Sequence, residues 1–263
     1  MNAADRHLAV PGARLRYRDE GAGPAVVLVH GWTLDLDVWQ PQAALAASQR
    51  VVRYDRRGFG LSTGKPSLMD DVVDLHTLLG TLGIDHPLLV GTSQGARVVL
   101  EFAARHPGAA RGLVLDGAPP LADADLPMTL FRELAARSGM AAFRAAWRAH
   151  PLTQLLTADP RLHELLAEIL ARYPGHDLLA PPADPHPGIG EAPLGRIRTP
   201  SLVVNGARDL DSRQRAGLRL QALLPDAEHV FVQEAAHLPN LDAPQRYNQI
   251  LAEFARRHVP AAA

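Results

Sequence analysis

The chain has 263 residues, which is long for one ordinary domain but lies within the range of single α/β domains, so its length favours one core. Hydrophobic residues make up 47% of the chain and charged residues 21%, a composition that excludes a disordered or fibrous protein. The net charge of -1 gives no field to attract nucleic acid or an anionic membrane, and the lack of cysteine excludes disulfides, thiolate metal sites and a cysteine nucleophile.

The first ten residues carry Asp5, Arg6 and His7 and contain no apolar run. We therefore expect neither a signal peptide nor a membrane span to begin there. The longest apolar stretches, such as residues 25–29, have the length of a strand and are too short to cross a bilayer. These features predict a soluble cytoplasmic protein with no nucleic-acid or membrane partner, and they leave a homodimer open.

Short apolar runs alternate with longer segments of helical period, which predicts βαβ units around a mostly parallel sheet. The expected strands are residues 7–10, 14–19, 25–29, 51–54, 87–90, 112–116, 201–204 and 228–232. The turn dipeptide Pro11-Gly12 predicts that the first two strands form a hairpin at the sheet edge. Most of the later runs are continuously apolar, as expected for strands that are covered on both faces.

Four helices are predicted from apolar residues at helical spacing, and they cover residues 68–82, 94–105, 213–224 and 244–257. The alternation of strands and helices breaks between Pro119 and Pro193, where two or three helical stretches rich in Ala, Leu and Arg follow one another. Residues 174–193 are dense in Pro and Gly and predict an irregular connection. We predict that residues 119–194 form a helical lid and that residues 1–118 and 195–263 form the α/β core.

The segment Gly91-Thr92-Ser93-Gln94-Gly95 fits the Gly-x-Ser-x-Gly pattern and lies between a predicted strand and a predicted helix, as that pattern requires. So sharp a turn strains the backbone of the serine, and the two glycines keep the strand and the helix from colliding. The serine hydroxyl is then presented at the carboxyl edge of the sheet, where open α/β sheets bind ligands. We predict Ser93 as a nucleophile and the Gln94 N–H as an oxyanion donor; the alternative is an exposed serine in a glycine-flanked turn.

A second oxyanion donor is expected in the loop after residues 25–29, which reads His30-Gly31-Trp32. Gly31 lets the backbone approach a substrate, and we predict the N–H of Trp32 as the donor. His30 is expected to fix this loop by hydrogen bonds, with a contact to the substrate as the alternative.

The base is expected late in the chain, because triads in this strand order run Ser, acid, His. His237 follows the last predicted strand and is the expected general base. Asp209 follows the strand at residues 201–204 and can hold the imidazole in the tautomer that accepts the serine proton. Asp211 and Asp116, the latter at the end of another central strand, are alternative acids.

With these residues, the chain resembles the α/β-hydrolase family over nearly its whole length. Residues 53–62 look like a loop of its cofactor-free haloperoxidase, enol-lactonase and esterase branches, and residues 237–241 look like their catalytic histidine loop. The resemblance implies an α/β-hydrolase fold, with Ser93, Asp209 and His237 as the triad and the Trp32 and Gln94 amides as the oxyanion hole. Within the first loop, the charges of Arg56-Arg57 are expected to brace the loop rather than to bind substrate.

Two departures from the family pattern leave the branch open. Gln94 stands where many enol-lactonases and C–C hydrolases carry Met or Leu, and Ala96 replaces a frequent glycine. A serine nucleophile argues against the branches of haloalkane dehalogenases and epoxide hydrolases, which use Asp.

The predicted activity is hydrolysis of a carboxylic ester or lactone through an acyl-enzyme, with no metal and no organic cofactor. Apolar side chains in the predicted lid and near His237 indicate a small to medium apolar substrate, unless they form a core of their own. The candidate substrate contacts are His30, Met128, Phe131, Phe143, Trp147 and Leu238. The alternatives are a C–C bond hydrolase or a cofactor-free perhydrolase with the same triad and, from another class, a slow-turnover ligand receptor.

Overall fold

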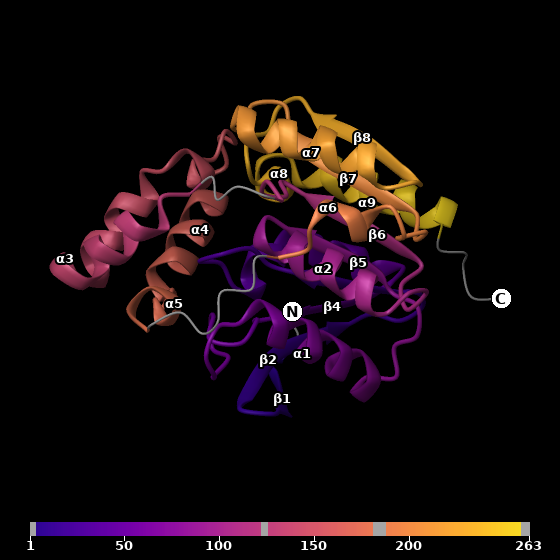
Figure 1. Cartoon of the computed structure of the whole chain (residues 1–263), viewed down its shortest axis with the longest axis horizontal. Helices are drawn as coiled ribbons and strands as arrows, with labels where there is room; N and C mark the ends of the chain where they lie inside the picture. The colour runs from indigo at the N-terminus through magenta and orange to yellow at the C-terminus, as the bar shows by residue number, and fades with distance from the viewer. Residues whose placement is uncertain (1–3, 122–125, 181–187, 259–263) are drawn as a thin grey trace.

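The computed structural model describes residues 4–121, 126–180 and 188–258 and contains an eight-stranded sheet of order β1-β2-β4-β3-β5-β6-β7-β8 (Figure 1). The strands are β1 (Arg6–Val10), β2 (Ala13–Glu20), β3 (Ala25–Val29), β4 (Arg50–Tyr54), β5 (Leu88–Thr92), β6 (Gly112–Asp116), β7 (Ser201–Gly206) and β8 (Ala227–Val232). Only the β1–β2 and β2–β4 pairs are antiparallel within these strands, and the other five pairs are parallel. This arrangement confirms the predicted α/β class, the mostly parallel sheet and the hairpin at its edge.

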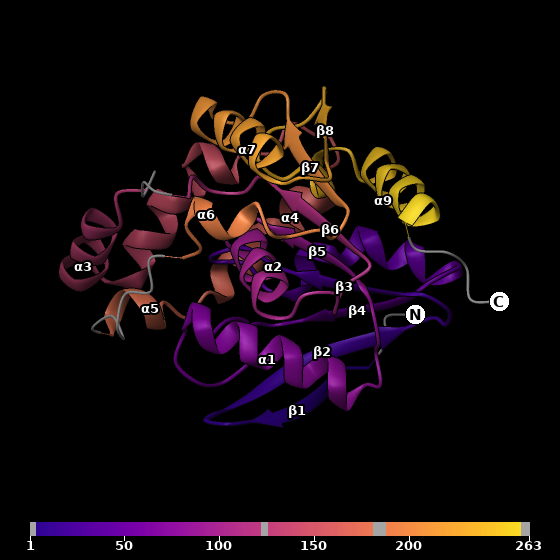
Figure 2. The ribbon, with the colours of Figure 1, turned by 45° about the vertical axis from the view of Figure 1, so that its right-hand side comes forward.

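Successive side chains of the central strands point to opposite faces of the sheet. Because these side chains are apolar, both faces have to be covered. In β3, Val26 and Leu28 enter the core on one face, whereas Val27 and Val29 enter the core on the other. The first face is covered by η1 (Leu36–Ala47) and α9 (Pro244–His258), and the second by α1 (Leu68–Thr81), α2 (Gln94–Arg105) and α7 (Asp211–Leu223). Both views show α1 and α2 side by side (Figures 1 and 2).

The 3-10 helix η1 was not predicted from the sequence. It is capped by Asp35, whose carboxylate accepts a hydrogen bond from the Asp37 amide at 3.0 Å, and it contains Pro41. Its three-residue period and its internal proline do not give the apolar pattern of an α-helix. It nevertheless buries Val38 and Trp39 against the sheet.

Further helices lie between β6 and β7, where the sequence predicted an insertion. They are α3 (Met128–Arg148), η2 (Pro151–Thr153), α4 (Pro160–Arg172), α5 (His176–Leu179) and α6 (Glu191–Leu194). Helices α3 and α5 lie beyond one side of the sheet in both views (Figures 1 and 2). The segment predicted as irregular holds α5 and α6, and residues 181–187 of it lie outside the described ranges. In the part of the chain that the structure describes, no helix is both long and apolar enough to span a membrane.

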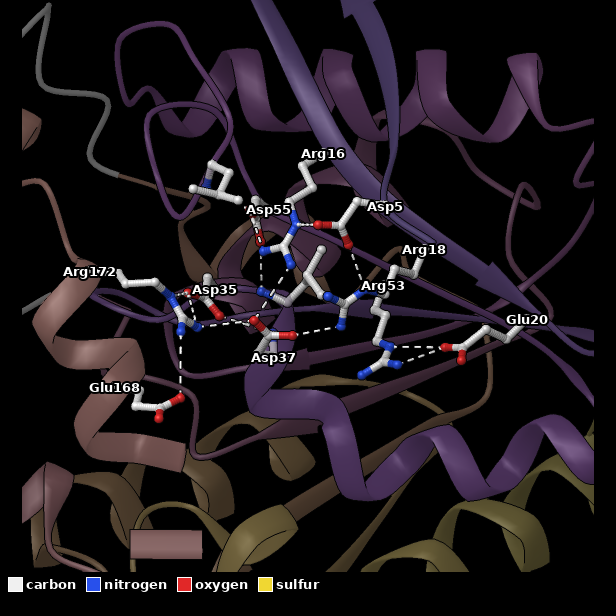
Figure 3. A network of polar contacts seen from close by, with 12 residues as sticks. Asp5, Arg16, Arg18, Glu20, Asp35, Asp37, Arg53, Asp55, Glu168 and Arg172 are labelled. Atoms are coloured by element: carbon white, nitrogen blue, oxygen red, sulfur yellow. Dashed lines mark hydrogen bonds and ion pairs between the residues drawn. The ribbon is translucent and has the colours of Figure 1, made fainter. Parts of the chain in front are cut away.

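A network of charged side chains fixes α4 to the core (Figure 3). Arg172 at the end of α4 donates to Asp35 Oδ2 at 2.9 Å and to Asp37 Oδ2 at 3.0 Å. Asp35 is almost fully buried, and burial raises the pKa of its carboxyl group while the charge of Arg172 lowers it. A buried carboxylate needs such a partner, so this contact holds the inserted helices against the segment that follows β3.

The turn from β5 into α2 depends on close approaches between backbones. A Cβ atom on Gly95 would lie 2.2 Å from the carbonyl oxygen of Val29, and one on Gly91 would lie 2.4 Å from the carbonyl oxygen of Gly95. Contacts this short are not tolerated, so only glycine lets α2 start directly against β3. The two glycines of the predicted motif are therefore required by packing.

We expect Gly95→Ala to lower the free energy of unfolding by about 3 kcal/mol, because the added methyl group meets a backbone that cannot yield. Thermal and urea unfolding measure the change. Gly80→Ala is the matched control: Gly80 lies within α1 with nothing within 4 Å of an added Cβ, so alanine there should stabilise the protein by about 0.5–1 kcal/mol. Equal stability of the Gly95→Ala protein and the wild type would show that the turn is not so constrained.

Candidate active site

Ser93 lies at the end of β5 in a backbone conformation that residues other than glycine rarely adopt, with φ 51° and ψ −119°. Its N–H donates to the carbonyl oxygen of Asp116 at 2.7 Å, which ties the turn to the neighbouring strand β6. Strain of this kind persists only where the surrounding structure enforces it, and it is concentrated at functional sites. The geometry presents the Ser93 side chain at the carboxyl edge of the sheet.

His237 and Asp209 are brought together from two different loops. Asp209 follows β7, and His237 follows β8 and precedes α8 (Pro239–Asp242). The two side chains are buried, and the His237 Nδ1–H donates to Asp209 Oδ2 at 2.9 Å. A neutral imidazole that donates from Nδ1 keeps its lone pair on Nε2, which is the tautomer that a general base requires.

The backbone after β6 also fits against His237. Gly117 has a φ of 52°, and a Cβ atom there would lie 2.9 Å from Cε1 of the imidazole. Glycine at this position therefore lets the chain support the ring without displacing it.

Ser93 and His237 line the same cavity, whose volume of about 20 Å³ leaves room for roughly one water molecule. The other lining residues are Trp32, Thr33, Leu34, Leu126, Trp147, Leu152, Thr153 and Leu238. Among the described residues, the structure gives Ser93 Oγ a hydrogen bond from Arg213 Nη1 at 3.4 Å and none with His237. Catalytic hydrogen bonds are often long or poorly aligned without substrate, so the lack of this bond does not argue against His237 as the base.

Arg213 is a component of the site that sequence reasoning missed. Its side chain is 1% exposed, and its Nη1 also donates to the carbonyl oxygen of Gly117 at 3.2 Å. It lies in the first turn of α7, where a cation opposes the helix dipole, so helix stability does not explain its position. Arg213, Arg215 and Arg219 share one helix, and nothing in the local pattern distinguishes the buried arginine from the exposed ones.

The two expected oxyanion donors flank the nucleophile. A Cβ atom on Gly31 would lie 3.1 Å from Ser93 Cβ, which shows how closely the loop after β3 approaches the turn. Within the described ranges, neither the Trp32 N–H nor the Gln94 N–H donates to another protein group. Both amides are therefore available to a ligand atom beside Ser93.

His30 is fully buried and holds the same loop in place. Its Nε2 accepts from the Arg56 N–H at 2.9 Å, and its Nδ1–H donates to the Gly31 carbonyl oxygen at 2.8 Å. Burial, and then the charge of Arg56, lower the pKa of His30 to about 3, so the ring is neutral. His30 is not among the residues that line the cavity, and this geometry corresponds to its expected bracing role and not to the alternative substrate contact.

Of the other candidate substrate contacts, Trp147 and Leu238 line the cavity, whereas Met128, Phe131 and Phe143 do not. Phe131 and Phe143 pack around Trp32 with ring centroids 5.9 Å from its ring, and Met128 joins the same core cluster. These three side chains support the cavity wall from behind. Helical spacing on α3 could not distinguish this supporting layer from the lining.

The two tryptophans of the cavity wall are each held by a hydrogen bond. Trp147 Nε1 donates to Thr33 Oγ1 at 2.8 Å, and Trp32 Nε1 donates to Asp177 Oδ2 at 2.6 Å. Their rings meet edge to face at a centroid distance of 4.8 Å. The wall is thus fixed by polar contacts as well as by packing.

Neither of the two alternative acids forms a hydrogen bond with His237 in the described residues. Asp116 is buried and accepts from the Tyr247 hydroxyl at 3.3 Å; burial, and then the charge of Asp209, raise the pKa of Asp116 well above its usual value. Asp211 is exposed on α7 and faces Arg215. In residues 4–121, 126–180 and 188–258, no three His, Asp or Glu side chains are grouped so that they could hold a metal ion.

Comparison with known proteins gives a match to the profile of the alpha/beta hydrolase fold over residues 24–244. Pimeloyl-(acyl-carrier protein) methyl ester esterase from Chromobacterium violaceum is 31% identical over 253 residues, which cover 89% of this chain and 94% of that protein. A thermophilic esterase from Thermogutta terrifontis has a TM-score of 0.83 at 27% identity, covering 98% of this chain and 100% of its own. The enol-lactonase from Burkholderia xenovorans has a TM-score of 0.81 at 26% identity, covering 95% and 100%.

We expect Asp209→Asn to lower kcat by about ten-thousandfold, because an amide stabilises the wrong tautomer of His237 and cannot stabilise its cation. Hydrolysis of an activated ester measures the loss. Asp116→Asn is the control and should retain nearly full activity. The opposite result, with the loss in the Asp116 variant, would transfer the role of the acid to Asp116.

The pH dependence of the stability of Asp116→Asn, compared with that of the wild type, tests the effect of the buried carboxyl group of Asp116. Because the pKa of Asp116 is raised in the folded protein, the stability it contributes is complete below its usual pKa of 3.8 and is lost as the pH rises towards the raised value. The free energy of unfolding of the variant should therefore fall less steeply than that of the wild type as the pH rises above about 4.

Proposed function

The chain belongs to the α/β-hydrolase family, and from this membership we propose that it is a serine hydrolase that cleaves carboxylic esters or lactones of small molecules through an acyl-enzyme. The observation that carries the proposal is the His237–Asp209 hydrogen bond at the cavity that also contains Ser93. Its relatives include two esterases and an enol-lactonase, which supports an ester-like bond as the target. The family membership itself confirms the resemblance predicted from the sequence.

In the proposed reaction, Ser93 Oγ attacks the carbonyl carbon of the substrate and its proton passes to His237 Nε2. Asp209 stabilises the imidazolium that forms. The oxyanion accepts hydrogen bonds from the Trp32 and Gln94 amides, each worth about a hundredfold to a thousandfold in rate. His237 then protonates the leaving alcohol, and a water molecule deprotonated by the same histidine releases the acid and regenerates Ser93.

We further propose that the inserted helices act as a lid that limits the acyl group. A cavity of about 20 Å³ is far smaller than the roughly 300–1,000 Å³ of typical ligand pockets. With Trp147 held by Thr33, the space beside Ser93 suits a short acyl chain. Longer acyl groups require Trp147 and α3 to move.

We expect Ser93→Ala to abolish turnover of activated esters, down to a residual rate at least about a thousandfold below that of the wild type. The assay is a panel of short and long acyl esters, lactones and vinylogous diketones, with circular dichroism as the check on folding. Undiminished hydrolysis by a folded Ser93→Ala protein would refute the proposed nucleophile. Turnover of diketones alone would indicate a C–C hydrolase, peroxide-dependent bromination a perhydrolase, and binding without turnover a receptor.

We expect Trp147→Ala to shift the acyl preference towards longer chains by at least about tenfold in the ratio of kcat/KM for hexanoyl to acetyl esters, because the pocket gains the volume of an indole. Trp147→Phe keeps a ring but loses the bond to Thr33, so it should shift the ratio less. Arg148→Ala, at the exposed neighbouring position, is the matched control. An unchanged ratio in both Trp147 variants would mean that the acyl group lies elsewhere.

A further inference from the structure

We propose that Arg56 is a positioning residue that aligns both donors of the oxyanion hole, acting on Trp32 through His30 and on Gln94 through its side chain. The inference rests on the proposed function, because the oxyanion hole has a role only if Ser93 attacks a carbonyl group. Arg56 comes from the loop after β4, and it contacts neither the cavity nor Ser93 in the described residues.

The contact with the first donor runs through one peptide plane. The backbone N–H of Arg56 donates to His30 Nε2, which leaves the ring proton on Nδ1, and this proton is donated to the Gly31 carbonyl oxygen. That carbonyl group and the Trp32 N–H belong to the same planar trans peptide, so they point in opposite directions. Fixing the Gly31 carbonyl group therefore fixes the direction of the Trp32 N–H.

The neutral state of His30 is needed for this arrangement, because a protonated Nε2 could not accept from Arg56. The buried position of His30 and the nearby guanidinium both oppose protonation and lower the pKa of the ring to about 3. The hydrogen-bond direction along the loop is thus fixed across the pH range in which a triad histidine works as a base.

The contact with the second donor is direct. Arg56 Nη1 donates to Gln94 Oε1 at 2.9 Å and to the His30 carbonyl oxygen at 3.4 Å, so one nitrogen joins the two segments that carry the donors. Gln94 is the first residue of α2. Because Arg56 holds its side chain, the backbone N–H of the same residue is held in the direction of the oxyanion. This bond gives a reason for Gln at a position where many relatives carry Met or Leu.

Arg56 is itself held from the opposite side. Its Nε and Nη2 donate to Asp71 Oδ2 of α1 at 2.9 and 2.5 Å, and its guanidinium lies 4.9 Å from the centroid of the Phe59 ring. Both charged side chains are buried; burial raises the pKa of Asp71 to about 6, and Arg56 opposes that rise. The guanidinium is therefore rigid enough to act as a template.

The test compares Arg56→Lys and Gln94→Met with Arg57→Lys. Lysine at position 56 keeps a charge for Asp71 and the backbone N–H for His30, but it lacks the planar fork that reaches Asp71 and Gln94 from opposite sides, so it tests the contact with Gln94. Methionine at position 94 removes the side-chain acceptor and leaves the backbone N–H. Arg57 is the matched control, because it lies in the same loop but pairs with Asp74 and Asp70.

For Arg56→Lys and Gln94→Met we expect kcat to fall by about 10- to 100-fold, part of the effect of one oxyanion donor, with KM changed by less than about threefold. The affinity of a boronic acid that forms a tetrahedral adduct with Ser93 should fall in parallel. Arg57→Lys should lower the melting temperature without either effect. His30→Phe should match the two test variants, and His30→Asn, which keeps a donor for Gly31, should recover part of the rate.

Variants that lose melting temperature but keep the wild-type kcat and boronic acid affinity would overturn the positioning role. An equal loss of kcat in Arg57→Lys would also overturn it, because the effect would then belong to the loop as a whole. Failure of the proposed function is seen separately, as hydrolysis that persists in Ser93→Ala.

Discussion

The close approach of α2 to β3 is the constraint on which the other parts of the site depend. Gly95 lies against the Val29 carbonyl oxygen, so the chain must turn within a few residues and Ser93 must accept a positive φ. The same approach brings the loop after β3 next to the nucleophile, with Gly31 against Ser93 Cβ. The backbone amides of Trp32 and Gln94 thus come from two segments that meet at Ser93, where we propose that they bind the oxyanion.

Buried charge imposes a second constraint, and the structure meets it differently at each position. Asp209 bonds to His237, and Asp71 bonds to Arg56, whereas Asp116 accepts from the Tyr247 hydroxyl and has its pKa raised by burial and by the charge of Asp209. The raised pKa favours the neutral form of Asp116, so its burial costs less than that of a second carboxylate. We propose Asp209 as the acid because the imidazole of His237 donates its hydrogen bond to that residue.

The sequence predicted what depends on local pattern and missed what depends on contacts between distant segments. The turn could be predicted from Gly91, Ser93 and Gly95 because the residues that need a missing Cβ atom lie close together in the sequence. The bonds from Arg213 to Ser93 and from Arg56 to Gln94 cross 120 and 38 positions of the chain. On a helix, charge and spacing are the same for a buried arginine as for an exposed one, so no local signal marks Arg213. The sequence predicts that Arg56 braces its loop, but it could not identify Gln94 as the partner of Arg56.

The segment after β3 couples the oxyanion hole to the inserted helices. Its Thr33, at a φ of 62°, accepts from Trp147 of α3, and its Asp35 and Asp37 bind Arg172 of α4. A substrate that displaces Trp147 therefore breaks a bond made by the residue next to Trp32, while Arg172 still holds α4. Because α3 bends at Gly139, with φ 80°, part of that helix can shift without moving the anchored end of α4. In the proposed reaction, the loop that supplies an oxyanion donor then also limits the size of the acyl group, so we expect an oversized acyl group to lower the rate as well as the affinity.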